Sequence, residues 1–334
     1  MEFSAPRTFA AGAVALDGGG MLADARLVYV TCGSLNAAGD NAVLMPTHFG
    51  GTHDHSLYLV GEDHALDPRR YLIVVVNLLG NGVSTSPSHG LGADFPVVSI
   101  ADNARLQARL LREELGVREL ALALGHSMGA IQAYHLAALE PRFVRRLAPI
   151  CGAARISDHN RVFLDGMRSI LMSEPGYAGG RYTTASLANL RTLARTWAAW
   201  PPSAHFYRHG LYRKLGYSSL PDYLARYWEA TYLAQDPNNL LAQIATWQTA
   251  DIGTLPPYGA DFARALAGIE ARAVVMPCVN DAYFPPEDSM LEVTHLRDAE
   301  LRPIQSQWGH WAGSGRNPAD TAFIDAQLRR LLAS

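Results

Sequence analysis

Charged side chains are scarce in this chain of 334 residues, at 18%, and neither sign dominates. The 28 Lys and Arg residues face 31 Asp and Glu residues, which leaves a net charge of −3. This balance excludes the basic stripe that nucleic-acid-binding proteins need and the polybasic tail that binds anionic lipid. Long apolar runs are also missing, since no stretch approaches the roughly 20 residues that span a bilayer. We therefore expect neither a nucleic-acid partner nor a membrane one.

Cysteine is rare as well, and its three positions exclude a disulfide framework. Cys32, Cys151 and Cys278 are odd in number, widely spaced and each in an apolar context. This pattern is typical of reduced thiols in the core of a cytoplasmic protein, not of disulfides or metal ligands. The first residues also lack the basic-then-apolar order of a signal peptide, so we expect a cytoplasmic location.

What the chain does have is an apolar content of 49%, arranged as strand-like runs that alternate with helical ones. Such alternation predicts an α/β fold with a mostly parallel sheet and helices on both faces. The predicted strands are residues 26–30, 41–45, 71–76, 120–124, 144–150, 271–276 and 300–305. The predicted helices of this part are residues 99–115, 130–139, 286–296 and 318–332.

The character of the sequence changes between residues 155 and 265. Regular β runs disappear, and helical stretches at 184–199 and 220–233 are interrupted by prolines and glycines. The segment holds four tryptophans: Trp197, Trp200, Trp228 and Trp247. We predict a helical cap over residues 155–265, inserted into a core made of residues 1–154 and 266–334. The tryptophans either pack the cap on the core or line an apolar access channel.

The most informative motif is Gly125-His126-Ser127-Met128-Gly129, which matches G-x-S-x-G. An apolar strand-like run precedes it and a helical run follows it. In this setting the motif predicts a sharp strand-to-helix turn that holds a nucleophilic serine above the sheet. The two glycines are expected because side chains there would collide with the neighbouring strand and helix. Ser127 is thus the candidate nucleophile.

A serine nucleophile needs a general base and an acid that orients the base. In chains with this turn the order is Ser, then Asp or Glu, then His. Asp281 follows a predicted strand, and His310 lies in a loop after the next predicted strand. We therefore predict a triad of Ser127, Asp281 and His310. Asp288 and Asp298 are weaker alternatives for the acid because they fall in or after a helix.

The oxyanion of an acyl-transfer reaction needs two preorganised N–H donors. The first expected donor is the backbone of Met128. The second should come from the glycine-rich loop after residues 41–45, with Gly50 preferred and Phe49 next. This loop also contains His48, His53, Asp54 and His55, which raises the alternative of a metal site. We expect no metal, because the loop already has a role and no second ligand cluster is evident.

Several of these segments together resemble the homoserine O-acetyltransferase family. The similarity runs over nearly the whole chain and rests on Asn41–Leu44, His48 with its loop, Ala65–Tyr71, Asn77–Gly82, Gly125–Gly129 with Gln132, and Asp281–Pro286. The resemblance implies an α/β-hydrolase fold with a helical cap, a Ser–Asp–His triad and an acyl-serine intermediate. It also implies a homodimer joined through the cap and no cofactor.

The departures from that family concern the acceptor. Its members carry a Tyr-Arg-Ser stretch in the cap that holds the substrate carboxylate, whereas this chain has Trp197–Ser203; Arg208 or Arg213 could substitute, but neither falls in the motif. The aspartate that usually follows the catalytic histidine is replaced by Trp311. An amino-acid acceptor would lose two charge-assisted contacts, each worth about 1.5–3 kcal/mol.

The chain is therefore similar to an esterase branch of that family, which cleaves small acetate esters. We expect serine-dependent hydrolysis of short-chain carboxylic esters, with substrate-binding side chains from Trp197, Trp200 and Trp311. The alternative is transfer of acetyl from acetyl-CoA to homoserine or another small alcohol. A non-catalytic ligand-binding protein and a different hydrolase on the same triad also remain open.

Overall fold

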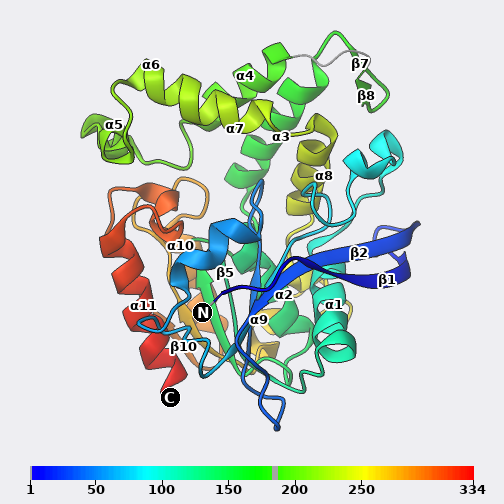
Figure 1. Ribbon diagram of the computed structural model, residues 1–334, viewed down its shortest axis with the longest axis vertical. Coiled ribbons are helices and arrows are strands. Elements are labelled where there is room, and N and C mark those ends of the chain that lie inside the picture. Colours follow the sequence, from blue (N-terminus) through cyan, green and yellow to red (C-terminus); the bar gives the residue numbers. More distant parts are fainter. Residues whose placement is uncertain (1, 183–186) are drawn as a thin grey trace.

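The computed structural model, which describes residues 2–182 and 187–334, is built on one eight-stranded sheet (Figure 1). In sheet order the strands are β1 (Arg7–Ala15), β2 (Met21–Cys32), β4 (Leu72–Val76), β3 (Ala42–Pro46), β5 (Leu120–His126), β6 (Arg146–Ile150), β9 (Arg272–Val275) and β10 (Ala299–Leu301). β2 pairs antiparallel with both β1 and β4, and all pairs from β4 to β10 are parallel. The predicted mostly parallel sheet is confirmed.

Alternate residues of the central strands face opposite sides of the sheet, as a β-strand requires. On β4, Val74 and Val76 belong to one buried cluster, while Ile73 and Val75 belong to another. The first cluster is covered by α1 (Ile100–Arg109), α2 (Met128–Leu139) and α9 (Phe262–Gly268). The second is covered by α11 (Pro318–Leu332). Both faces are buried, which explains the continuous apolar run of this strand.

The helix boundaries follow the local signals closely. Ser99 and Asp102 form the expected capping box at the start of α1, and Gly116 has a positive φ of 72° just after that segment. α10 spans Pro286–His295, one residue shorter than predicted. The prediction missed β1, because it is an exposed strand with Gly12 at an irregularity in its pairing with β2, so no clear alternation marks it.

The cap lies above the carboxyl ends of the strands (Figure 1). It contains α3 (Asp158–Met172), α4 (Leu187–Trp197), α5 (Ala204–Arg208), α6 (Leu220–Tyr223), α7 (Ala230–Leu233) and α8 (Pro237–Gln248). A two-residue hairpin, β7 (Tyr177–Ala178) with β8 (Arg181–Tyr182), interrupts the helical character that was predicted throughout. The predicted start of a helix at Thr184 lies outside the described residues.

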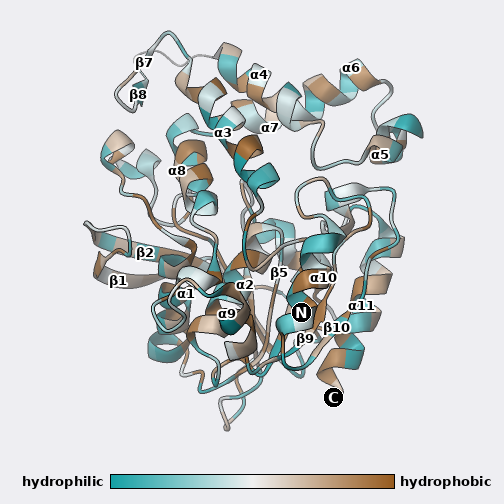
Figure 2. Ribbon diagram, turned by 180° about the vertical axis from the view of Figure 1, so that it is seen from behind, coloured by the Kyte–Doolittle hydropathy of each residue, from teal (hydrophilic) through white to brown (hydrophobic). Residues whose placement is uncertain are grey.

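Helices of both cap and core carry polar and apolar residues (Figure 2), as expected where one face is buried. Ile252, Leu255 and Leu266 pack in the same cluster as the sheet residues. We therefore propose that the cap ends near Ala250 and that the core resumes there, not at residue 266. Within the described part of the chain, no helix is both long and apolar enough to cross a membrane.

Candidate active site

Ser127 occupies the turn between β5 and α2, with φ 59° and ψ −127°. A non-glycine residue adopts such a positive φ only where the surroundings enforce it. The flanking glycines permit it: a Cβ on Gly125 would lie 2.3 Å from the Gly129 carbonyl carbon, and a Cβ on Gly129 would lie 2.4 Å from the Pro46 oxygen. The predicted strand–serine–helix turn is confirmed, and its glycines are required by close backbone approach.

Asp281 and His310 are brought together from two different loops. Asp281 follows β9, His310 lies in a short helical turn (Gly309–Gly313) after β10, and the His310 Nδ1 donates to Asp281 Oδ2 at 2.7 Å. The other carboxylate oxygen accepts the N–H groups of Tyr283 and Phe284 at 2.8 and 3.2 Å. Because these bonds fix the carboxylate, they also fix the imidazole, and its Nε2 is left to act on a substrate.

Neither of the two alternative acids, Asp288 and Asp298, is the hydrogen-bond partner of His310. Asp288 lies in the first turn of α10, and Asp298 lies 3.9 Å from Arg272. Neither carboxylate pairs with His310 among the described ion pairs.

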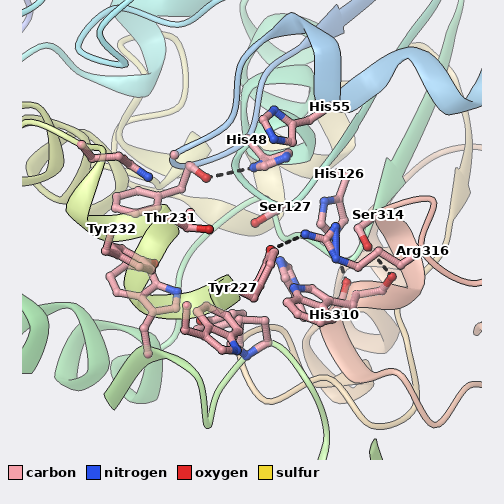
Figure 3. Close-up of a pocket in the computed structure, with 18 of the residues that line it drawn as sticks. His48, His55, His126, Ser127, Tyr227, Thr231, Tyr232, His310, Ser314 and Arg316 are labelled. Atoms are coloured by element: carbon pink, nitrogen blue, oxygen red, sulfur yellow. Dashed lines mark hydrogen bonds between the residues drawn. The ribbon is translucent and has the colours of Figure 1, made fainter. Parts of the chain in front are cut away.

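Ser127 and His310 line one pocket of about 800 Å³, its open mouth included (Figure 3). Both are nearly fully buried in the protein, at 4% and 5% exposure. No residue of the described chain forms a hydrogen bond with the Ser127 hydroxyl. In enzymes without substrate such bonds are commonly long and shorten when substrate binds. The arrangement can therefore carry out nucleophilic catalysis with a base of fixed orientation.

The expected oxyanion donors need one correction. Met128 is the first residue of α2, so its N–H has no partner inside the helix. The Gly50 N–H, however, donates to Oε1 of the buried Gln243 on α8 at 2.8 Å, so it is not free to hold an oxyanion. No hydrogen bond within the described residues uses the Phe49 N–H. We therefore move the proposed second donor from Gly50 to Phe49.

Two of the three expected substrate-binding tryptophans line the pocket and one does not. Trp197 and Trp311 are part of its wall. Trp200 lies beyond the end of α4 and is not part of the wall; its ring packs 4.4 Å from that of Phe163 and 5.8 Å from that of Tyr283. The expectation for Trp200 is therefore wrong: it stabilises the cap instead.

Other pocket residues were not predicted from the sequence. They are Tyr227, Thr231, Tyr232, Gln235, Tyr283, Ser314 and Arg316. Trp228 and Trp247, noted only as cap tryptophans, line it too. For Arg316 a signal existed, since it follows His310 by six residues in the same loop. The cap residues carry no such signal, because only the folded cap brings them over Ser127.

The histidines near the pocket have separate partners and do not form a metal site. The His48 Nδ1 donates to the Phe49 carbonyl at 2.9 Å, and the His126 Nε2 donates to the His310 carbonyl at 2.9 Å. Burial lowers the pKa of His48 to about 4, and burial followed by the charge of His310 lowers the pKa of His126 well below its usual range. Both rings are therefore neutral near pH 7. Among the described residues, no group of three or more His, Cys, Asp or Glu side chains could hold a metal ion.

Comparison with known proteins supports these observations. A probable esterase of Corynebacterium glutamicum is 35% identical over 98% of this chain and 95% of its own length. The ethyl acetate hydrolase of Pseudomonas veronii is 35% identical over 97% of this chain and 94% of its own. A homoserine O-acetyltransferase of Trichormus variabilis is 30% identical over 88% of this chain and 86% of its own.

The solved structure of the acetyl esterase MekB superposes with a TM-score of 0.95 at 35% identity, covering 99% of this chain and 97% of that one. A model of the alpha/beta hydrolase fold matches residues 42–313, which include the serine turn and both triad partners. The resemblance to esterases and homoserine O-acetyltransferases found in the sequence is confirmed. This chain belongs to the α/β-hydrolase fold family.

Proposed function

We propose that this protein hydrolyses short-chain carboxylic esters, acetate esters above all, through an acyl-serine intermediate. One observation carries the proposal. His310, held by a buried hydrogen bond of 2.7 Å to Asp281, lines the same pocket as Ser127, which sits on a turn with positive φ. The esterase relatives, at 35% identity over nearly the full chain, support the same reaction.

Acylation follows from this geometry. His310 Nε2 takes the proton of the Ser127 hydroxyl as Oγ attacks the ester carbonyl, and Asp281 stabilises the imidazolium. The N–H groups of Met128 and Phe49 hold the oxyanion of the tetrahedral intermediate. When that intermediate collapses, the bond from carbon to the alcohol oxygen breaks, and His310 gives its proton to the departing alcohol.

Deacylation reverses these roles with water in place of the alcohol. His310 takes a proton from a water molecule, whose oxygen attacks the acyl carbon. The bond to Ser127 Oγ breaks, the serine regains the proton from His310, and the carboxylic acid leaves.

The pocket wall supports a small acyl group. The Phe49 ring stacks on Trp197 with centroids 4.7 Å apart and lies 5.9 Å from the Trp247 ring. Trp197 also packs 5.5 Å from Tyr232. These large rings from core and cap lie beside the proposed oxyanion donor, so we expect them to limit the length of the acyl chain.

Acyl transfer to an amino-acid alcohol such as homoserine is the rival, and the pocket disfavours it. Within the described residues, no Asp or Glu lines the pocket, so nothing there would pair with an ammonium group. Release of CoA from acetyl-CoA that depends on added homoserine would favour transfer over hydrolysis.

We also propose a homodimer joined through the cap, as the family resemblance implies, and a cytoplasmic location, as the three widely spaced, buried cysteines indicate. The esterase itself needs only a small-molecule substrate. Sedimentation equilibrium of the purified chain would decide the oligomeric state, and a mass of one chain would reject the dimer.

Replacing the nucleophile tests the proposal. We expect Ser127→Ala to lower kcat for p-nitrophenyl acetate by on the order of 10⁴-fold or more. A serine-directed fluorophosphonate should add one covalent group to the parent protein, located at Ser127 by mass spectrometry, and none to the variant. Circular dichroism would verify that the variant is folded, and a folded variant that retains most of its activity would reject the mechanism.

A further inference from the structure

Arg316 is a cation in the pocket without an anionic partner. Its guanidinium carbon lies 4.4 Å from the centre of the Trp311 ring and 5.2 Å from that of Tyr227, and one N–H donates to the Tyr227 hydroxyl. No carboxylate of the described residues lies within ion-pair distance. The two rings and the hydroxyl hold the guanidinium in place while leaving most of its five N–H donors unused.

The residues around Arg316 do not neutralise its positive charge. The imidazoles of His48, His55 and His126 share the pocket wall with Arg316, and no acidic side chain of the described residues does. The charge of Arg316 adds to burial in lowering the pKa of both His48 and His126. A half-buried cation in a pocket without acidic side chains favours an anionic ligand, because an anionic partner recovers part of the free-energy cost of removing the cation from water.

The chemistry decides which end of an ester lies near Arg316. His310 must reach the leaving oxygen to protonate it, so the alcohol part of the ester lies on the side of His310. Trp311 follows His310 directly, and Arg316 packs on Trp311. Figure 3 shows Ser127 between Thr231 and Tyr232 on one side and Ser314 and Arg316 on the other. Arg316 thus belongs to the alcohol side, whereas the rings of Phe49, Trp197 and Tyr232 belong to the acyl side.

We propose that Arg316 binds a carboxylate carried by the alcohol part of the substrate, so that the preferred esters are acetate esters of short hydroxy acids. The planar guanidinium can donate two parallel N–H groups to such a carboxylate. This inference rests on the proposed esterase function. It would give specificity to a side of the pocket on which the other described residues carry no full charge to bind an anion.

The test compares two substrates that differ in one charge: 2-acetoxyacetate and its neutral amide, 2-acetoxyacetamide. The measured quantity is the ratio of their kcat/KM values, because differences in intrinsic reactivity cancel between enzyme variants. We expect Arg316→Gln to lower the ratio of anion to amide about tenfold to a hundredfold. For the parent protein, KM of the anion should rise with added salt while KM of the amide stays constant.

Arg155 provides the matched control. It too packs on an aromatic ring, 4.0 Å from the centre of Phe262, but lies outside the pocket. Arg155→Gln therefore removes the same charge and the same kind of contact, and should leave the ratio within twofold. Should Arg316→Gln not fold, Arg316→Lys keeps the charge but loses the two-pronged geometry, and should still lower the ratio severalfold.

Failure of the proposed role of Arg316 and failure of the proposed esterase function give different results. An unchanged ratio in the Arg316 variants, or an equal loss for both substrates, would mean that Arg316 only supports Trp311 and Tyr227, and would overturn this inference alone. Failure of the parent protein to hydrolyse either compound or ethyl acetate would instead overturn the esterase function on which the inference rests.

Discussion

At the scale of the residue, Ser127 can take its position because its neighbours Gly125 and Gly129 have no side chains. Its φ of 59° places the hydroxyl at the pocket, and the chain can close around it only because Gly129 passes next to the Pro46 carbonyl. The proposed oxyanion site also depends on a single contact. The side-chain amide oxygen of Gln243 accepts the Gly50 N–H, so that N–H is not available to an oxyanion. At this site, single atoms decide which groups can act.

We expect Gly129→Ala to lower the free energy of unfolding by about 1–3 kcal/mol and to reduce activity, because its Cβ would meet backbone that cannot shift without moving β3. Gly166→Ala is the control. Gly166 lies in α3, where a Cβ would meet nothing within 4 Å, and the change should raise stability by about 0.5–1 kcal/mol. Urea unfolding of both variants measures this, and equal effects would contradict the close-approach argument.

At the scale of the element, a buried carboxyl ties three segments of the core together. Glu292 on α10 accepts the Tyr134 hydroxyl of α2 at 2.9 Å and the Ala154 N–H at 2.6 Å. α2 begins at the residue after the nucleophile, so this contact anchors the helix that supports Ser127. Burial of the carboxyl raises the pKa of Glu292 from its ordinary 4.5 to about 8.

This raised pKa predicts a pH dependence of stability. The folded protein holds a proton that the unfolded chain releases above pH 4.5, so the stabilisation is complete below pH 4.5 and is lost as pH rises through about 8. Its slope is at most about 1.4 kcal/mol per pH unit in that window. We expect Glu292→Gln, which cannot titrate, to flatten the decline in the free energy of unfolding between pH 5 and 8.

Glu287→Gln serves as the comparison, because Glu287 is exposed on the same helix. Denaturant unfolding at several pH values should give this variant the same slope as the parent protein. A parent-like slope in Glu292→Gln would show that Glu292 does not govern the pH dependence.

At the scale of the whole molecule, the substrate pocket exists only because the cap covers the core. Phe49 comes from the loop after β3, and its stacking partner Trp197 ends α4 of the cap. Gln243 of α8 joins the same loop to the cap by a hydrogen bond. The placement of the cap therefore shapes the pocket wall and positions the loop that carries the proposed Phe49 donor.

We expect Trp197→Ala to enlarge the acyl side of the pocket and to raise kcat/KM for p-nitrophenyl hexanoate relative to the acetate by about tenfold, since longer chains gain buried apolar surface. Trp200→Ala is the control because Trp200 does not line the pocket and packs most closely on Phe163, which does not line it either. Both variants should lose stability, but only the first should change the chain-length preference. A similar change in both would place the acyl site elsewhere.

Most of the fold could be predicted from sequence, and the proposed catalytic trio could be chosen from it, because their signals are local. Buried strands appear as continuous apolar runs, and glycines mark the turn around Ser127. The parallel sheet then brings the loops that follow β9 and β10, with Asp281 and His310, to the same edge. β1 was missed because its alternation is weak.

The sequence by itself determined the α/β order of the core and the choice of the proposed nucleophile, base and acid, since each rests on a local pattern in the chain. Only the tertiary structure decided that the Gly50 N–H already has a hydrogen-bond partner, that Trp200 does not line the pocket and that Arg316 does. These outcomes depend on contacts between distant segments, such as the bond from Gly50 to Gln243 across 193 positions. No local pattern carries that information, because it arises only when the cap closes over the sheet.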